Sequence, residues 1–380
     1  MTDSSKPEAP SAPQVATVAP MPPKAVAAPA GAATAPAGSG AAGAPQTFSW
    51  MHKSKQWGTR VKPNKKGLTL GALNVGVYGD IPDHWEDQTR MPRGSIGRPG
   101  VPPIGYSIRS KQELWAESAA DLYEEGIQRR WIPATDVPWA SIEPLPDDVE
   151  AAMCQICTEL CQYANTEIEA ISLWQDHMSY GYHEVKMFLA TNSFDCARMF
   201  EAFRKRALVN GGGMGLENKG DVNRMILESR GGWTETVSYL HLMRGTFTLN
   251  LLRHGLAFAH NDAERVIFAH CIQDTARHLT YALEHLRYAV AHQEDQALIL
   301  QTFLVVGESI YARELKDPAL REALAIVYGG GIEGARGEGM KLAVGVFRSW
   351  IEHYLECCDF IGVPRRATLH PALAKYRVVP

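Results

Sequence analysis

Two seven-residue strings decide the fold: FDCARMF at 194–200 and QDTARHL at 273–279. Both contain Asp-x-Ala-Arg, and the two copies of this motif begin 79 residues apart, at Asp195 and Asp274. Each string lies within a long segment whose apolar side chains recur at helical spacing, and another long helical segment precedes each. A pair of helices that is used twice is therefore predicted.

Around these strings the pattern predicts helices throughout the chain from residue 145 onward. Pro146, followed by three acidic residues within four positions, is typical of a helix start, and the glycines at 211–213 are typical of a helix end. Most segments exceed the ~12 residues of an average helix, and none shows strand-like alternation. An all-α fold, a long-helix bundle, is expected. The predicted helices cover 146–175, 182–209, 234–258, 261–292, 294–315, 318–328 and 339–360.

The N-terminal part differs in composition from the expected bundle at 145–380. Residues 1–45 contain 15 Ala and 9 Pro and no aromatic residue, which predicts a disordered Ala/Pro-rich tail. A stiff spacer and a partner-docking arm are the alternatives. Residues 46–144 are rich in Gly, Pro and Trp (Trp50, Trp57 and Trp85), and we expect an extended, irregular arm with one short helix at 111–129.

Composition excludes several classes of protein. A formal net charge of -4 and a pI near 6.4 argue against a nucleic-acid partner, which requires a basic face. The apolar runs fall short of the ~18 residues of a membrane span, so no membrane partner is expected. Seven cysteines, an odd and low number for 380 residues, together with the lack of a signal-peptide pattern, favour a cytoplasmic location.

The two strings resemble the ferritin-like di-iron carboxylate superfamily, specifically its ribonucleotide-reductase-like and bacterial di-iron oxygenase branch. In that family, the second and fourth bundle helices carry Asp-Glu-x-Arg-His, whose Glu and His bind iron. One Glu from each of the first and third helices completes the site, since iron prefers converging carboxylate and imidazole ligands. The segments 183–186, 204–207 and 284–288 are also similar, and the resemblance covers about residues 145–370. It implies a ferritin-like bundle.

Four of the six ligand positions that the resemblance implies hold other residue types. The second helix has a thiol and a thioether in place of Glu and His, and the fourth has a hydroxyl in place of Glu. Arginine replaces the glutamate of the third helix, in RGTFT at 244–248. The six positions of this vestigial metal cavity are Glu167, Cys196, Met199, Arg244, Thr275 and His278.

No metal is predicted in this chain, because only Glu167 and His278 remain as ligands. Glu169 is an alternative register for the glutamate of the first helix. Arg244 is permanently charged, and we expect it to pair with Glu167 across the former metal cavity.

The Asp and Arg of each motif are retained. The resemblance implies that such groups orient the metal ligands and tie the helices together. Their retention without the ligands predicts a scaffold that kept its fold and lost its metal. The four residues are Asp195, Arg198, Asp274 and Arg277.

The favoured function is that of a non-catalytic, degenerate ferritin-like subunit. It would pair with and stabilise a homologous metal-bearing subunit in a di-iron oxygenase complex, and would also dock a reductase component. The alternative is an active di-iron oxygenase or hydroxylase that holds two iron ions with Glu167, His278 and atypical ligands. A third hypothesis is a protein that binds an apolar ligand in the vacated cavity. The candidate atypical ligands are Glu169, Glu184, Glu201, His241 and Glu284.

Two further clusters have metal-like spacing. Cys154, Cys157 and Cys161 share one helical face, and core packing is favoured over a zinc site because one helix seldom wraps three ligands around an ion. His270, Asp274 and His278 are spaced four apart, and a polar core network is favoured over a metal site.

Overall fold

The structure is a computed structural model that describes residues 59–86 and 90–377. The expectations for the tail at 1–45 and for Trp50 and Trp57 lie outside the described residues. The chain divides into two units, Met1–His52 and Lys53–Pro380, and the second unit contains all of the described helices.

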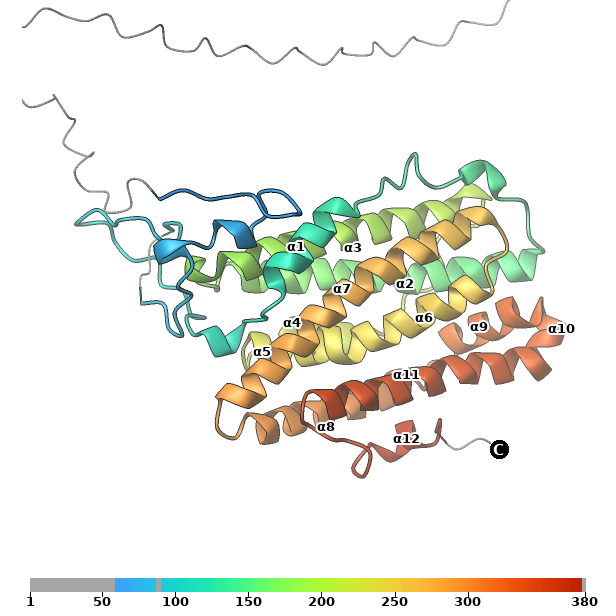
Figure 1. Cartoon of the computed structure of the whole chain (residues 1–380). Coiled ribbons are helices and arrows are strands. Elements are labelled where there is room, and N and C mark those ends of the chain that lie inside the picture. The colour runs from blue at the N-terminus through green and yellow to red at the C-terminus, as the bar shows by residue number, and fades with distance from the viewer. Residues whose placement is uncertain (1–58, 87–89, 378–380) are drawn as a thin grey trace, which may run out of the picture. The chain divides into compact units, whose positions relative to one another are not determined.

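Four long helical stretches form the centre of this second unit (Figure 1). The first two pack along each other, as do the last two, and the second also contacts the fourth. The predicted all-α bundle is confirmed, and the described residues contain no strand. The stretches are α2 (Asp147–Gln175), α3 (His183–Val209), a composite of α5 (Trp233–Val237), a π-helical segment (Ser238–Gly245) and α6 (Thr246–Ala257), and finally α7 (Asp262–His292).

The remaining helices surround this centre. The C-terminal helices cover one side of it, since α9 packs on α2 and α11 packs on both α6 and α9, while α4 packs on α8. Three short helices, α4, α10 and α12, were not predicted. The outer helices are α1 (Ala119–Gln128), α4 (Asp221–Glu228), α8 (Gln296–Glu314), α9 (Ala319–Gly329), α10 (Ile332–Gly334), α11 (Met340–Phe360) and α12 (Pro371–Ala374), with a second π-helical turn at Ala335–Gly339.

The prediction of a single helix at 111–129 is wrong. The structure has a 3-10 turn (Lys111–Glu113) and the separate helix α1. Ser110 and Glu113 cap the short turn reciprocally. Ser118, just before α1, donates from its backbone N and its Oγ to Glu284 Oε2, at 2.9 and 2.7 Å. The short turn ends at Leu114, whose φ of -153° is not helical, and the contact of Ser118 with α7 is invisible in the local sequence pattern.

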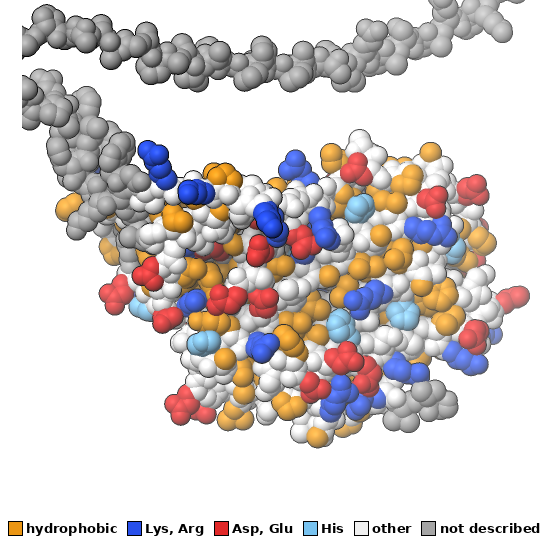
Figure 2. Space-filling view, in the orientation of Figure 1, with side chains coloured by type: hydrophobic (Ala, Val, Ile, Leu, Met, Phe, Trp, Pro, Cys, Tyr) orange, Lys and Arg blue, Asp and Glu red, His pale blue; other side chains and the backbone are white. Residues whose placement is uncertain are grey.

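Two further features are the distribution of charge on the surface and the apolar composition of the helices. On the face shown in Figure 2, Lys and Arg are interspersed with Asp and Glu, and the described side chains form no continuous basic patch there. Among the described residues, no helix has the length and the apolar composition that crossing a bilayer requires.

Asn261 provides a test of how α7 begins. Its side-chain Oδ1 accepts a hydrogen bond from the backbone N of Glu264 at 2.9 Å, which satisfies one free donor of the first turn. We expect Asn261→Ala to lower the free energy of unfolding by about 1 kcal/mol, measured by urea denaturation. The control is Asn165→Ala, in the interior of α2 on an exposed face; an equal loss in both variants would contradict the capping role.

Candidate functional site

A polar centre lies where α2, α3, α7 and the third helical stretch face one another. It surrounds a cavity of about 10 Å³, room for about one water. A cavity of this volume has no space for the apolar ligand of the third hypothesis. Five of the six predicted positions line it. The five are Glu167, Cys196, Met199, Thr275 and His278.

Two histidines bind the carboxylate of Glu167. Glu167 Oε1 lies 3.0 Å from His278 Nδ1 and 3.1 Å from His241 Nε2. Burial raises the pKa of this carboxyl, but the charge on His278 and the hydrogen bonds from both histidines outweigh burial. The pKa of Glu167 therefore lies well below its usual value, and the group is ionised.

His278 lies between two carboxylates. Its Nδ1 faces Glu167, and its Nε2 is 3.3 Å from Asp195 Oδ2. Burial lowers the pKa of an imidazole, but here the two carboxylates prevail and raise the pKa of His278 to about 9. At neutral pH, His278 is therefore an imidazolium that donates from both nitrogens.

The Asp and Arg of the two motifs form a crossed ladder between α3 and α7. Each arginine contacts the aspartate of its own helix and that of the other: Arg198 reaches Asp274 Oδ2 at 3.1 Å, and Arg277 reaches Asp195 Oδ2 at 2.8 Å. Trp131 Nε1 also donates to Asp274 Oδ2, at 2.9 Å. These contacts join α3 to α7.

The connected buried groups have balanced charges. His278 joins the crossed ladder to Glu167 through Asp195, so that the network contains three carboxylates and three cations. The network is neutral without a metal ion, which matters because an uncompensated buried charge is costly. Its members are Glu167, Asp195, Asp274, Arg198, Arg277 and His278.

The predicted ion pair between Arg244 and Glu167 is wrong. Arg244 donates from Nε to Tyr311 Oη at 3.1 Å and from Nη1 to Asn223 Oδ1 at 2.8 Å. Its guanidinium lies over the ring of Tyr163, 4.0 Å from the centroid. The arginine is thus held outside the cavity.

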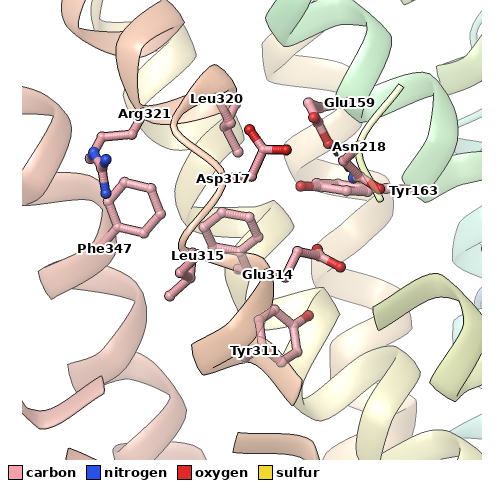
Figure 3. A pocket seen from close by; sticks show the side chains of 11 residues that line it. Glu159, Tyr163, Asn218, Tyr311, Glu314, Leu315, Asp317, Leu320, Arg321 and Phe347 are labelled. Carbon is pink, nitrogen blue, oxygen red and sulfur yellow. Dashed lines mark hydrogen bonds between the residues drawn. The ribbon is translucent and has the colours of Figure 1, made fainter. Parts of the chain in front are cut away.

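The π-helical segment explains this difference. Its wider turn shifts the angular positions of the side chains along the third stretch, and His241 rather than Arg244 faces Glu167. Tyr163, Tyr311 and Glu314, which surround Arg244, also line a separate pocket of about 30 Å³ (Figure 3). Arg244 Nη2 is 3.8 Å from Glu314 Oε1, so its charge is balanced there.

Of the five alternative ligands, only His241 contacts a residue that lines the cavity, through its bond to Glu167. The other four lie elsewhere, with partners of their own: Glu169 is exposed and accepts from Asn165, and Glu201 is exposed beside Lys205. Glu184 is buried against Arg93, and Glu284 binds Ser118. The alternative register that used Glu169 is therefore wrong.

The donor set does not fit two iron ions. A dinuclear site of this kind needs four carboxylates and two imidazoles. The cavity is lined by three carboxylates, Glu167, Asp195 and Asp274, and both aspartates are bound by the arginines of the two motifs. One ion fits the donor types better, because the ligand atoms of Glu167, Cys196 and His278 lie within 4.8 Å of one another, with His241 beside them. Burial, followed by the charge of Glu167, raises the pKa of the Cys196 thiol well above its usual value.

The other sequence clusters are structural. All seven cysteines are free and buried, and Cys154 contacts Glu150 and the carbonyl of Ala207. His270 stacks on Trp131, with ring centroids 4.9 Å apart. Among the described residues, neither the three cysteines of α2 nor His270 belongs to a group with metal-binding geometry.

Two sequence comparisons were made with known proteins. A scan with models of protein families found none that matches the chain, and a search of curated proteins found no match either.

Proposed function

We propose that this chain is a non-catalytic helical-bundle subunit that pairs with a homologous, metal-bearing subunit of a di-iron oxygenase complex. In this role, the chain stabilises its partner and contributes to docking of a reductase, without oxygen chemistry of its own. The resemblance of the two motifs to the di-iron family suggests the complex. The loss of the metal ligands in this chain suggests that it is the non-catalytic subunit of that complex.

One observation carries the proposal: the buried network is neutral without a metal ion. In a dinuclear site, cations offset the carboxylates that converge on them. Here the imidazolium of His278 and the guanidinium groups of Arg198 and Arg277 offset Glu167, Asp195 and Asp274. The helices are thereby joined by ion pairs where a metal-bearing relative would use ligand bonds.

The proximity of Glu167, Cys196, His241 and His278 favours a second candidate, a site for one metal ion such as zinc. It would require the thiol of Cys196 and the imidazolium of His278 to lose their protons. The raised pKa values of both groups oppose this step.

Purification of the tagged chain from the cells that make it tests the proposal. We expect a stoichiometric complex with a second helical chain that contains two Glu-x-x-His motifs, and iron that stays with this second chain when the two are separated. A chain that purifies alone, holds two iron ions and consumes oxygen would contradict the proposal.

A further inference from the structure

Helix α8 presents an uncharged, mostly apolar stripe to solvent. An outer helix of a bundle normally turns charged side chains to water, and a helix that is apolar on all sides is normally buried. The first twelve residues of α8, QALILQTFLVVG at 296–307, include no charged residue. We call the exposed set that recurs at helical spacing along α8 the α8 stripe: Leu298, Ile299, Thr302, Val305, Val306 and Ser309.

The side chains of the α8 stripe can be covered at little cost. Its four large apolar residues are 42–63% exposed. Its two hydroxyls already donate within the helix: Thr302 Oγ1 donates to the carbonyl of Leu298 at 3.1 Å. Ser309 Oγ donates to the carbonyl of Val305 at 3.0 Å. Covering this face therefore removes apolar surface from water without leaving a hydroxyl donor unpaired.

The two ends of the α8 stripe carry opposite charges. Glu294 and Asp295 precede the stripe, Arg313 and Lys316 follow it, and all four are exposed. Asp295 and Arg313 are about 27 Å apart along the helix. Arg313, although 3.4 Å from Asp221, keeps 61% of its side chain exposed. The midpoint between Asp295 and Arg313 and that between Glu294 and Lys316 both fall at 304–305, so the stripe is complementary to an antiparallel copy of itself.

We propose that two copies of this chain associate through the α8 stripe, with their α8 helices antiparallel about a twofold axis near Val305. Around such an axis the apolar centre of one stripe packs on that of the other, and each acidic end meets a basic end. A single pair of helices buries less than the ~800 Å² per partner of a standard interface, so we expect a dimer of micromolar affinity. The proposal is independent of the proposed function, because it concerns this chain alone.

Sedimentation equilibrium of the full-length chain measures the association. As the concentration is raised from about 1 to about 200 μM, the mass should rise from 41.8 kDa toward twice that value, with a Kd on the order of 10 μM. Val305→Glu places two carboxylates beside the twofold axis and should weaken the dimer at least about a hundredfold. The control is Leu173→Glu, on α2 and 54% exposed, which should leave the dimer unchanged.

An exchange of charges tests the antiparallel arrangement. Glu294→Lys alone, or Lys316→Glu alone, sets like charges against each other at both ends of the interface and should weaken the dimer about tenfold at low salt. The double variant restores opposite charges at both ends, and its Kd should return to within about threefold of the value for the unmodified chain.

Three results would overturn the proposal. The first is a chain that stays monomeric at the highest concentration, as when residues outside the described ranges or a different protein cover the α8 stripe. The second is a dimer that Val305→Glu leaves as tight as before, and the third is a double variant no tighter than the single ones. If Val305→Glu fails to fold by circular dichroism, the charge exchange between Glu294 and Lys316 still decides.

Discussion

Arg277→Met is expected to lower the free energy of unfolding by about 3–5 kcal/mol, the cost of breaking a buried ion pair by removing one partner. Arg277 is almost fully buried and contacts both Asp195 and Asp274. Without its charge, the network has three carboxylates and two cations. Methionine keeps much of the side-chain length, so the loss reports the charge more than the volume.

Urea denaturation measures this effect against two further variants. Arg224→Met removes one partner of an exposed pair with Glu228, and we expect a change of at most about 0.5 kcal/mol. Adding Asp195→Asn to Arg277→Met restores the charge balance and should recover part of the loss. If Arg277→Met and Arg224→Met lose the same amount, the buried network does not stabilise the fold as inferred.

The stability contributed by His278 should fall between pH 6.5 and about 9. Its pKa is about 9 in the folded chain, and it returns to about 6.5 in the unfolded chain. Because the folded state binds the proton more tightly, the contribution is complete below pH 6.5 and is lost as the pH rises through 9. The difference in pKa corresponds to about 3 kcal/mol.

The measurement compares the unmodified chain with His278→Gln, which does not titrate in this range. The difference in unfolding free energy between the two proteins should shrink as the pH is raised from 6 to 9.5. Titrating groups outside the buried network are common to both proteins and cancel. A difference that stays constant over this range would mean that His278 is neutral in the folded chain and that the network is not balanced as described.

The bundle was predictable because long helices leave strong local signals. Asn261 and Pro146 mark helix starts, and the apolar periodicity of α2, α3 and α7 continues for many turns. The break before α1 was not predictable, because the apolar periodicity continues across Leu114, where the backbone leaves the helical conformation, and the contact of Ser118 with Glu284 joins residues distant in sequence.

The site was predicted in part. The motif spacing correctly placed Asp195, Asp274 and His278 together, since one face of each helix repeats every three to four residues. The predicted position of Arg244 in the third stretch was wrong, because a π-helical segment changes the register of the side chains there and leaves no clear signature in sequence. His241, named only as an alternative ligand, therefore takes the place expected for Arg244, and Trp131, which donates to Asp274, was missed.

Metal content per polypeptide tests the central claim most directly. The chain is produced in iron-rich medium, purified without chelators, and analysed for iron and zinc by mass spectrometry, with Cys196→Ala as a matched variant. A buried network that is already neutral predicts far less than one ion of either metal per chain, in both proteins. Two irons per chain, or one zinc that disappears in Cys196→Ala, would contradict it.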